Sequence, residues 1–470
     1  MSVNRMISRR RFLRVSALGA ASVTLAACAA PPAAAPKSAE TAAQPAVQPT
    51  TAPAAAGGTV KLAEFYSLLQ DSNGKLNQDW IASIVKQFEA ENPGWKVEQE
   101  GIKWDQIDNK AILDLAAGVD HDLMYSSPQL MAKHLKANTY IDLTPMINQL
   151  PKSEQDDLTW SPGYKAASVG GKQIALATGV HTRGNAYNRD MFKKAGLDPD
   201  KPFTTLDEVV EAAKKTTQAD KDIWGLGMFL GNSRATIEVY YAPVVWNYGG
   251  DFYDAANQKA TLTGDASVKA VQWIYDLVHT HKVTPPYAYA SDADYGNLIL
   301  QAMLDGKIAQ SMGFGSYWIG ALQDKNMLKD CFPAKATCEP ATVGMMVQPS
   351  TVRATFTNAW CMSVHKLSKN PEVAWALMQT IFKPNNLKTY PDAGLPARLT
   401  GWATPEYSSA FYKTWLDAAQ SGRPMPPTPY YPELADTMSA AIQEILSKKA
   451  DIPATLKRFE DEWNGKYAGQ

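Results

Sequence analysis

The sequence predicts an α/β protein built from two globular lobes, and three observations support this fold class. The chain has 470 residues, which is more than one hydrophobic core usually holds. Strand and helix patterns alternate from residue 59 to residue 125, as in a parallel or mixed sheet covered by helices. Residues 174–199 form an extended segment that bends at Thr178-Gly179 and then turns helical, as expected of a chain that passes between two sheets.

The alternation begins with an apolar strand over residues 59–66 and a helix over residues 79–90. A strand over 95–99, a helix over 106–117 and a strand over 122–125 follow. Residues 66–71 and 125–129, at the carboxyl ends of two of these strands, are polar and aromatic. Ligands of such sheets bind at the carboxyl ends of strands, so we expect part of a binding site there.

The N-terminus carries the most specific signal in the chain. The run Ser8-Arg9-Arg10-Arg11-Phe12-Leu13 resembles a twin-arginine export signal, and the apolar segment behind it is too short to span a bilayer. The segment ends in Leu25-Ala26-Ala27-Cys28, which resembles a lipoprotein cleavage site with Cys28 as the lipidated residue. We therefore expect a mature protein outside the cytoplasm, anchored by lipid to the cell membrane, either in a periplasm or on the outer face of the cytoplasmic membrane.

Composition narrows the choice of partner. Residues 29–58 are rich in Ala, Pro and Thr and predict a disordered linker. Removal of five signal-peptide arginines lowers the formal net charge from −1 to about −6, and no basic cluster follows. A mildly acidic chain without a basic face is a poor nucleic-acid binder.

No motif for catalysis, a metal or a cofactor stands out. The chain lacks a nucleophile elbow, a zinc-protease helix and a phosphate-binding loop, and its six histidines are scattered. Carboxylates are plentiful, so an exported, lipid-anchored, glycan-active enzyme remains the alternative function. Cys331 and Cys338 flank a short loop in an oxidising compartment and predict a small disulfide, whereas Cys361 lies in an apolar strand and predicts an inert thiol.

Several phrases, in order along the chain, resemble the bacterial family 1 extracellular solute-binding proteins of ABC importers. The resemblance covers roughly residues 59–467, and we identify the chain as similar to this maltose-binding-protein-like family. The phrases are Leu115-Ala116-Ala117-Gly118 with Asp122, Tyr140-Ile141-Asp142-Leu143-Thr144 (taken as a strand), Tyr187-Asn188-Arg189-Asp190, Thr204-Thr205-Leu206-Asp207-Glu208, Gly313-Phe314-Gly315-Ser316-Tyr317-Trp318 and Gly394-Leu395-Pro396-Ala397-Arg398.

The resemblance implies a type II periplasmic-binding-protein fold, in which each lobe is a mixed sheet flanked by helices and crossover strands form a hinge. It divides the chain into residues 59–178 and 351–385 for lobe one and residues 179–350 and 386–470 for lobe two. It also implies a monomer without catalytic activity that closes around a solute and delivers it to a membrane permease.

The chain's aromatic residues favour a mono- or oligosaccharide as the solute. A sugar ring presents an apolar C–H face to an aromatic ring and a polar edge to Asp, Asn, Gln or Arg side chains. Tyr317 and Trp318, which follow two glycines where relatives carry a stacking aromatic, form the best ligand-facing pair. The full set of candidate ligand residues is Tyr66, Ser67, Asp71, Trp104, Ser126, Gln129, His181, Arg183, Tyr240, Trp246, Tyr317, Trp318 and Arg398.

Arg183 and Arg398 leave a second cargo class open. Two guanidinium groups in one cleft suit a phosphorylated or carboxylated ligand better than a neutral sugar.

Overall fold

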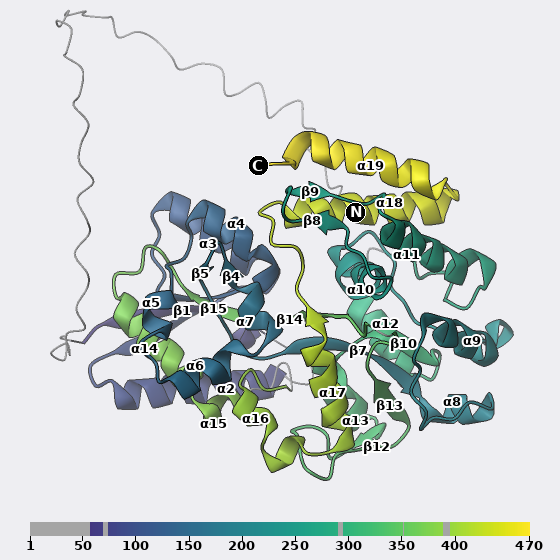
Figure 1. Cartoon of the computed structure of the whole chain (residues 1–470). Helices are drawn as coiled ribbons and strands as arrows, with labels where there is room; N and C mark the ends of the chain where they lie inside the picture. The colour runs from purple at the N-terminus through teal and green to yellow at the C-terminus, as the bar shows by residue number, and fades with distance from the viewer. Residues whose placement is uncertain (1–56, 69–73, 290–294, 351, 389–394) are drawn as a thin grey trace, which may run out of the picture. The chain divides into compact units, whose positions relative to one another are not determined.

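The computed structural model describes residues 57–68, 74–289, 295–350, 352–388 and 395–470, and Ala56–Gln470 form one compact unit. The predicted signal, Cys28 and most of the linker lie outside the described residues. Asp71 does as well. The described chain folds into two main sheets, each with its own hydrophobic core, so the two-lobed α/β prediction is confirmed (Figure 1).

The first sheet is mixed. Its β1 pairs in parallel with β2 and β3, whereas β15 runs antiparallel to β3 and β6. In spatial order its strands are β2 (Lys96–Gly101), β1 (Thr59–Glu64), β3 (Leu123–Ser126), β15 (Cys361–Val364) and β6 (Leu176–Ala177).

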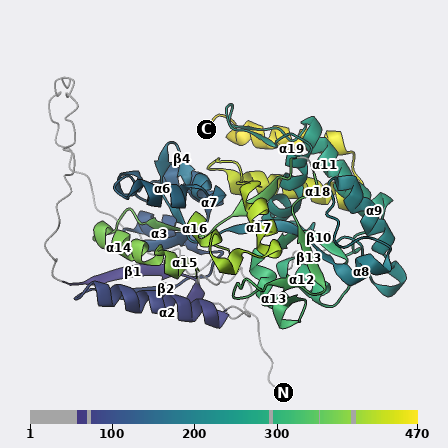
Figure 2. The ribbon, with the colours of Figure 1, turned by 60° about the horizontal axis from the view of Figure 1, so that its bottom comes forward.

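Short helices and one long helix surround the first sheet, and Figure 2 shows α2 running along β1 and β2. Trp80, Ile81, Ile84 and Phe88 recur on one face of α2 and are buried, because this spacing gives the helix one apolar side. The elements are η1 (Tyr66–Leu68), α2 (Gly74–Glu91), α3 (Ile107–Ala117), η2 (Pro128–Leu130), α4 (Met131–Ala137), α5 (Thr144–Ile147), α6 (Lys152–Thr159), α7 (Pro162–Ala166), α14 (Pro371–Ile381), α15 (Pro384–Lys388) and α16 (Leu399–Trp402).

The second sheet is organised around β7, which pairs antiparallel with β10, β13 and β14. All eight residues of β7 are buried, so this strand lies at the centre of the lobe. The strands are β7 (His181–Asn188), β10 (Gln310–Gly315), β13 (Val343–Met346), β14 (Thr355–Asn358) and β16 (Gly422–Arg423).

Helices from three parts of the chain cover the second sheet. A capping box opens α9: the Thr205 hydroxyl accepts from the Glu208 backbone N–H, and the Glu208 carboxylate accepts from the Thr205 N–H. The elements are α8 (Arg189–Lys194), α9 (Leu206–Thr216), η3 (Ala219–Lys221), η4 (Thr236–Tyr241), α10 (Ala242–Asn247), α11 (Asp265–Tyr275), η5 (Asp276–Thr280), α12 (Tyr295–Leu304), η6 (Ser316–Trp318), α13 (Ile319–Asp324), η7 (Pro405–Tyr407), α17 (Ala410–Gln420), α18 (Tyr431–Lys448) and α19 (Ile452–Tyr467).

Three connecting segments run side by side between the two sheets. The Thr178 N–H donates to the Trp360 carbonyl oxygen at 2.8 Å, and the Val180 N–H donates to the Leu395 carbonyl oxygen at 3.2 Å. The chain changes sheet between Ala177 and His181 and again between Asn358 and Cys361. Leu387 and Ala397 pack in the first core, whereas Leu395 packs in the second.

One predicted strand, over residues 140–144, is wrong. Tyr140 forms only an isolated bridge to His365, and Thr144 already begins α5. The following Pro145 has no N–H to donate to a sheet ladder, and its fixed φ suits the first turn of a helix.

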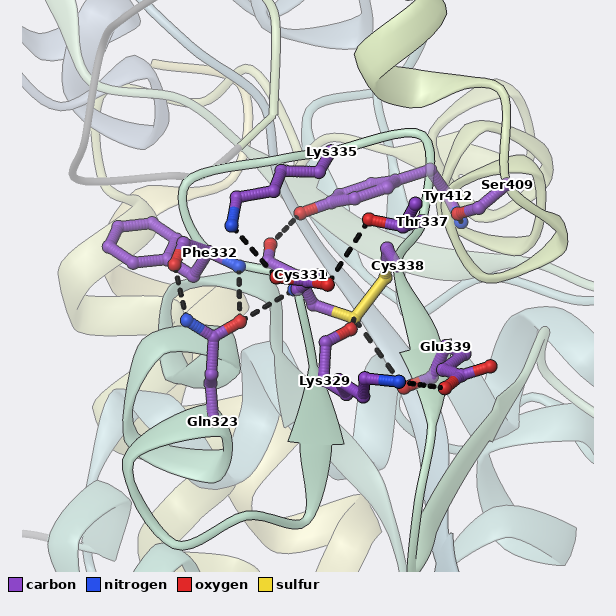
Figure 3. Close-up of a disulfide and its surroundings, with 11 residues drawn as sticks. Gln323, Lys329, Cys331, Phe332, Lys335, Thr337, Cys338, Glu339, Ser409 and Tyr412 are labelled. Atoms are coloured by element: carbon purple, nitrogen blue, oxygen red, sulfur yellow. Dashed lines mark hydrogen bonds and ion pairs between the residues drawn. A yellow bond between two sulfur atoms is a disulfide. The ribbon is translucent and has the colours of Figure 1, made fainter.

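Cys331 and Cys338 form the predicted disulfide, which closes the loop between β11 (Leu328–Lys329) and β12 (Glu339–Pro340) (Figure 3). The Gln323 side-chain oxygen accepts from the Cys331 N–H at 2.6 Å and from the Phe332 N–H at 2.8 Å. The Tyr412 hydroxyl donates to the Cys331 carbonyl oxygen. The loop is therefore attached to both α13 and α17. Two further small hairpins are β4 (Ser168–Val169) with β5 (Lys172–Gln173) and β8 (Tyr253–Asp254) with β9 (Lys259–Ala260).

Candidate ligand-binding site

The strand β7 presents His181 and Arg183 on the same face, because alternate residues of a strand point the same way. Both side chains meet Tyr317. The Arg183 guanidinium carbon lies 5.0 Å from the Tyr317 ring centre, and the His181 and Tyr317 ring centres are 6.0 Å apart. The Arg183 guanidinium also lies 5.6 Å from the ring centre of Phe356 on β14. Arg183 is thus held between two aromatic rings.

Tyr317 belongs to η6, directly after β10. A Cβ atom at Gly315 would come within 2.5 Å of the Tyr317 ring, so the glycine gives this ring room to lie against the backbone. Tyr317 keeps part of its surface accessible, whereas its neighbour Trp318 is only 5% exposed and packs in the core. Of the predicted aromatic pair, Tyr317 alone has a ring face to offer a ligand.

Glu238 on η4 is the second anchor of the site, and sequence reasoning missed it. Its Oε1 accepts a hydrogen bond of 2.8 Å from the Tyr431 hydroxyl at the start of α18. The side chain of Gln129 on η2 lies near Glu238 and acts to lower the pKa of its carboxyl. Gln129 follows a strand of the first sheet and Glu238 packs on the second, so groups from both lobes meet at this carboxylate.

Both positively and negatively charged side chains act on Glu238 and its neighbours. Burial raises the pKa of the Glu238 carboxyl, while the charges of Arg234 and Arg183 act against that rise. Burial also raises the pKa of Asp436; Arg234 opposes this rise and the repulsion of Glu433 adds to it. Two guanidinium groups and three carboxyl groups therefore share this region.

We use the name Glu238 cluster for Gln129, Arg183, Glu238, Tyr317 and Tyr431. The cluster combines an aromatic ring face, a carboxylate acceptor, a guanidinium donor and a side-chain amide. Such a set suits a ligand with an apolar face and a hydroxylated edge.

Most predicted residues of the first lobe lie elsewhere. Tyr66 is fully buried and packs against Tyr125 with ring centres 5.0 Å apart. Ser126 is also buried, with its hydroxyl 3.0 Å from that of Ser363. Ser67 and Trp104 are exposed, Trp104 to 59%. Among the described first-lobe candidates, only Gln129 reaches the Glu238 cluster.

Two predicted aromatics of the second lobe belong to its core. Tyr240 and Trp246 are each 1% exposed and pack in the second hydrophobic cluster. The Trp246 ring also lies beneath the Arg423 guanidinium, 4.8 Å from ring centre to guanidinium carbon. Large aromatic side chains stabilise a core mainly by burying their surface, which leaves these two rings little surface for a ligand.

Arg398 makes its contacts inside the protein. Its Nε donates to Asp157 at 2.7 Å, one terminal nitrogen donates to Glu154 at 3.0 Å, and the other donates to the Phe382 carbonyl oxygen at 2.7 Å. The residue is 4% exposed. All three guanidinium nitrogens are thus engaged, and we leave Arg398 out of the site.

Glu238, Arg234 and Tyr431 are the residues that the sequence analysis did not select. One signal was available: Glu238 interrupts the apolar run Ile237, Val239, Tyr240, where an acidic side chain must find partners. Its partners, however, come from positions far away in the sequence.

A separate cavity of about 330 Å³ is lined by Trp160, Pro162, Lys165, Leu399, Gln420, Gly422 and Pro424. None of the predicted ligand residues lines it. Within the described ranges, no three His, Cys, Asp or Glu side chains are arranged to hold a metal ion. A search of the same ranges finds no helix of the length and apolarity needed to cross a membrane.

The chain is similar to known binding proteins in sequence and in fold. A putative binding protein of Brucella abortus is 25% identical over 385 residues, which covers 80% of this chain and 87% of the relative. The fold matches an ABC transporter solute-binding protein from Thermotoga lettingae bound with alpha-D-tagatose (TM-score 0.71, 19% identity, 87% of this chain and 98% of the other). It also matches an ABC substrate-binding protein from Listeria monocytogenes in complex with cycloalternan (TM-score 0.69, 21% identity, 87% and 98%). The model of the bacterial extracellular solute-binding protein family matches residues 73–388, and the chain belongs to this family.

Proposed function

We propose that this protein is the solute-binding component of an ABC importer, which captures a mono- or oligosaccharide between its lobes and delivers it to a membrane permease. The observation that carries the proposal is the partly accessible ring of Tyr317, which the Arg183 guanidinium of the crossing strand β7 overlies at 5.0 Å. Two proteins of similar fold are bound to sugars, which supports the ligand class.

The proposed capture mechanism follows from where the ligand groups lie. A sugar stacked on Tyr317 can donate hydroxyl hydrogens to Glu238 and accept hydrogen bonds from Arg183 and Gln129. Because these groups come from both lobes, only a closed arrangement makes every contact at once. The ligand then favours closure by the difference in its affinity for the two states.

The proposal also includes a lipid anchor at the N-terminus and the absence of catalytic activity. Cys28 would carry the lipid, because an arginine pair, a short apolar segment and a cysteine occur in the order of an exported lipoprotein. The protein would act as a monomer and leave its sugar chemically unchanged. Product analysis after incubation with glycans tests this last point, and turnover that depends on Glu238 would contradict it.

Thermal unfolding in the presence of a ligand panel tests the main proposal. The panel contains neutral sugars, sugar phosphates, uronic acids and amino acids. One neutral sugar at a hundred times its Kd should stabilise the protein by about 2.7 kcal/mol. If an amino acid or no compound raises Tm, the proposed ligand class is wrong.

Tyr317→Ala tests the site itself. Loss of the ring face should weaken sugar binding by roughly tenfold or more, since a stacking ring contributes on the order of 1 kcal/mol or more beyond its buried area. Tyr287→Ala removes another partly exposed tyrosine outside the cluster and serves as the matched control. Equal affinity of the two variants, measured by calorimetric titration, would remove Tyr317 from the site.

A further inference from the structure

Three histidines that lie far apart in the sequence come together in the first lobe, away from the residues assigned to the ligand. His121 precedes β3, His134 lies on α4, and His365 follows β15. They are 3%, 0% and 0% exposed, respectively. The ring centres of His121 and His365 are 6.0 Å apart, with one ring edge-on to the other. Buried imidazoles are uncommon, and three in one region call for a common partner.

That partner is the helix α3. Its residues Asp108, Ala111 and Asp114 are buried and recur at three-residue intervals, so they lie along one side of the helix. Each histidine places its Nε2 near one oxygen atom of this row, and the pairs are His134 with Asp108 Oδ1 at 2.8 Å, His365 with the Ala111 carbonyl oxygen at 3.2 Å, and His121 with Asp114 Oδ2 at 2.8 Å. We use the name histidine clamp for His121, His134 and His365.

His365 differs from the other two members of the clamp. Carbonyl oxygens only accept hydrogen bonds, so its Nε2 carries the hydrogen, and its Nδ1 accepts from the Leu367 N–H at 3.4 Å. The neutral ring therefore uses both nitrogens. A second proton would occupy Nδ1, remove the acceptor of Leu367 and place two N–H donors opposite each other. Among the described residues, no carboxylate forms a hydrogen bond or an ion pair with His365 that could compensate for this charge.

The electrostatic surroundings disfavour a charged His365 ring. Burial lowers the pKa of its imidazole below the ordinary value of 6.5; the charges of His121 and His134 add to this effect, while the Ala111 carbonyl and the charge of Asp114 oppose it. The other titratable groups around the clamp are Asp108 and Lys110 of α3, Glu100 of β2, Asp122 before β3, and Tyr140, which bridges to His365. The Asp122 carboxylate is engaged, since it accepts from the Lys61 N–H at 2.8 Å and the Ser368 hydroxyl at 2.6 Å.

The helix α3 is also attached to the loop that follows β3. Asp108 Oδ1 accepts from the Ser127 N–H at 3.0 Å, and Asp108 Oδ2 accepts from the Ser127 hydroxyl at 2.5 Å. The next residue, Pro128, begins η2. One carboxylate thus joins α3 to α4 through His134 and to the start of η2 through Ser127, so a change in the packing of α3 reaches this loop.

We propose that the histidine clamp is an acid-sensitive fastening of α3, in which the neutral rings hold the helix on the first lobe and protonation of His365 loosens it. In the loosened state the ring is solvated and takes up a proton more readily than in the packed state. The fastening is therefore complete above about pH 6.5 and weakens as the pH falls below that value. The proposal does not depend on which solute the protein binds.

Hydrogen exchange of the whole chain, followed by mass spectrometry and corrected for intrinsic exchange rates, tests the proposal. It compares α3 and residues 127–130 with α9, a helix of the second lobe that contains no histidine. One proton taken up on opening shifts the equilibrium by up to tenfold per pH unit. Between about pH 7.5 and about pH 5.5, protection of α3 and of residues 127–130 should therefore fall by roughly fivefold or more relative to α9.

His365→Gln keeps an amide donor for the Ala111 oxygen and does not titrate, so its relative protection should hardly change over this range. His281→Gln alters a partly exposed histidine of the second lobe and should respond as the wild-type protein does. An equal response of α3 and α9 in the wild-type protein, or an unchanged response in His365→Gln, overturns the proposal. The wild-type comparison needs no substitution, so it decides the matter even if His365→Gln fails to fold.

Discussion

At the residue scale, Arg398 shows how neighbours decide the role of a side chain. A ligand contact was expected at this position, yet the Arg398 side chain donates to Asp157 and Glu154 of α6. Asp157 accepts from Arg398 and also from the backbone N–H and hydroxyl of Thr400. This ion pair is buried, and a buried ion pair with satisfied partners is costly to break from one side.

Arg398→Met should therefore lower the free energy of unfolding by about 3–5 kcal/mol, because it leaves the buried Asp157 carboxylate without its counter-charge. Urea denaturation followed by circular dichroism measures the change. Lys457→Met, which breaks an exposed pair with Asp461 on α19, should change the free energy of unfolding far less, because solvent screens that pair. Similar losses in the two variants would contradict a structural role for Arg398.

Also at the residue scale, burial separates the predicted aromatics into two groups. Tyr66, Tyr240, Trp246 and Trp318 pack in the cores, while Tyr317 remains partly accessible beside Arg183. All five have residue types that bind sugars well. The surrounding packing distinguishes a core ring from a ring with an accessible face, and the packing partners cannot be read from the neighbouring sequence.

At the scale of elements, the disulfide loop between β11 and β12 is attached on several sides. Gln323 of α13 accepts from two of its backbone N–H groups, and Tyr412 of α17 donates to the Cys331 carbonyl oxygen. Lys329 and Glu339 form an exposed ion pair at 3.0 Å across the hairpin. The covalent bond thus closes a loop that hydrogen bonds already dock onto the second lobe.

Replacing both cysteines, as Cys331→Ser with Cys338→Ser, should lower the free energy of unfolding by about 2–3 kcal/mol. The reason is that a short crosslinked loop removes conformational entropy from the unfolded chain. Thermal and urea unfolding measure the loss. A reductant should reproduce the loss in the wild-type protein and leave the double variant unaffected, so an equal effect of reductant on both would contradict this explanation.

At the scale of the whole molecule, the three connectors are held to one another by backbone hydrogen bonds between Thr178 and Trp360 and between Val180 and Leu395. Few residues join the two sheets, and the Glu238 cluster draws on both lobes. This arrangement suits a hinge, in which small backbone changes at the connectors move each packed lobe as a body.

Saturation with the sugar that binds best should reduce the radius of gyration measured by solution scattering, because contacts from both lobes favour the closed state. The Tyr317→Ala variant, at the same sugar concentration, should keep the larger radius. Superimposable profiles of the free and saturated wild-type protein would contradict hinge closure.

Much of the fold was predictable because it depends on local patterns. Apolar periodicity located α2 and α3, whose helical faces repeat within a few residues. The strand predicted over residues 140–144 is absent. The segment has the residue pattern of a strand, but its pairing is limited to one isolated bridge between Tyr140 and His365. Strand pairing depends on distant residues, and local alternation does not specify them.

By itself, the sequence determined the two-lobed α/β class, the family resemblance, the disulfide and a place for Arg183 and Tyr317 near the crossing strand. Only the tertiary structure decided that Glu238 and Tyr431 join them, and that Arg398, Trp246 and Trp318 do not. The physical reason is range: helix caps and apolar periods act between near neighbours, whereas Glu238 and Tyr431 are brought to 2.8 Å by the packing of α18 on η4.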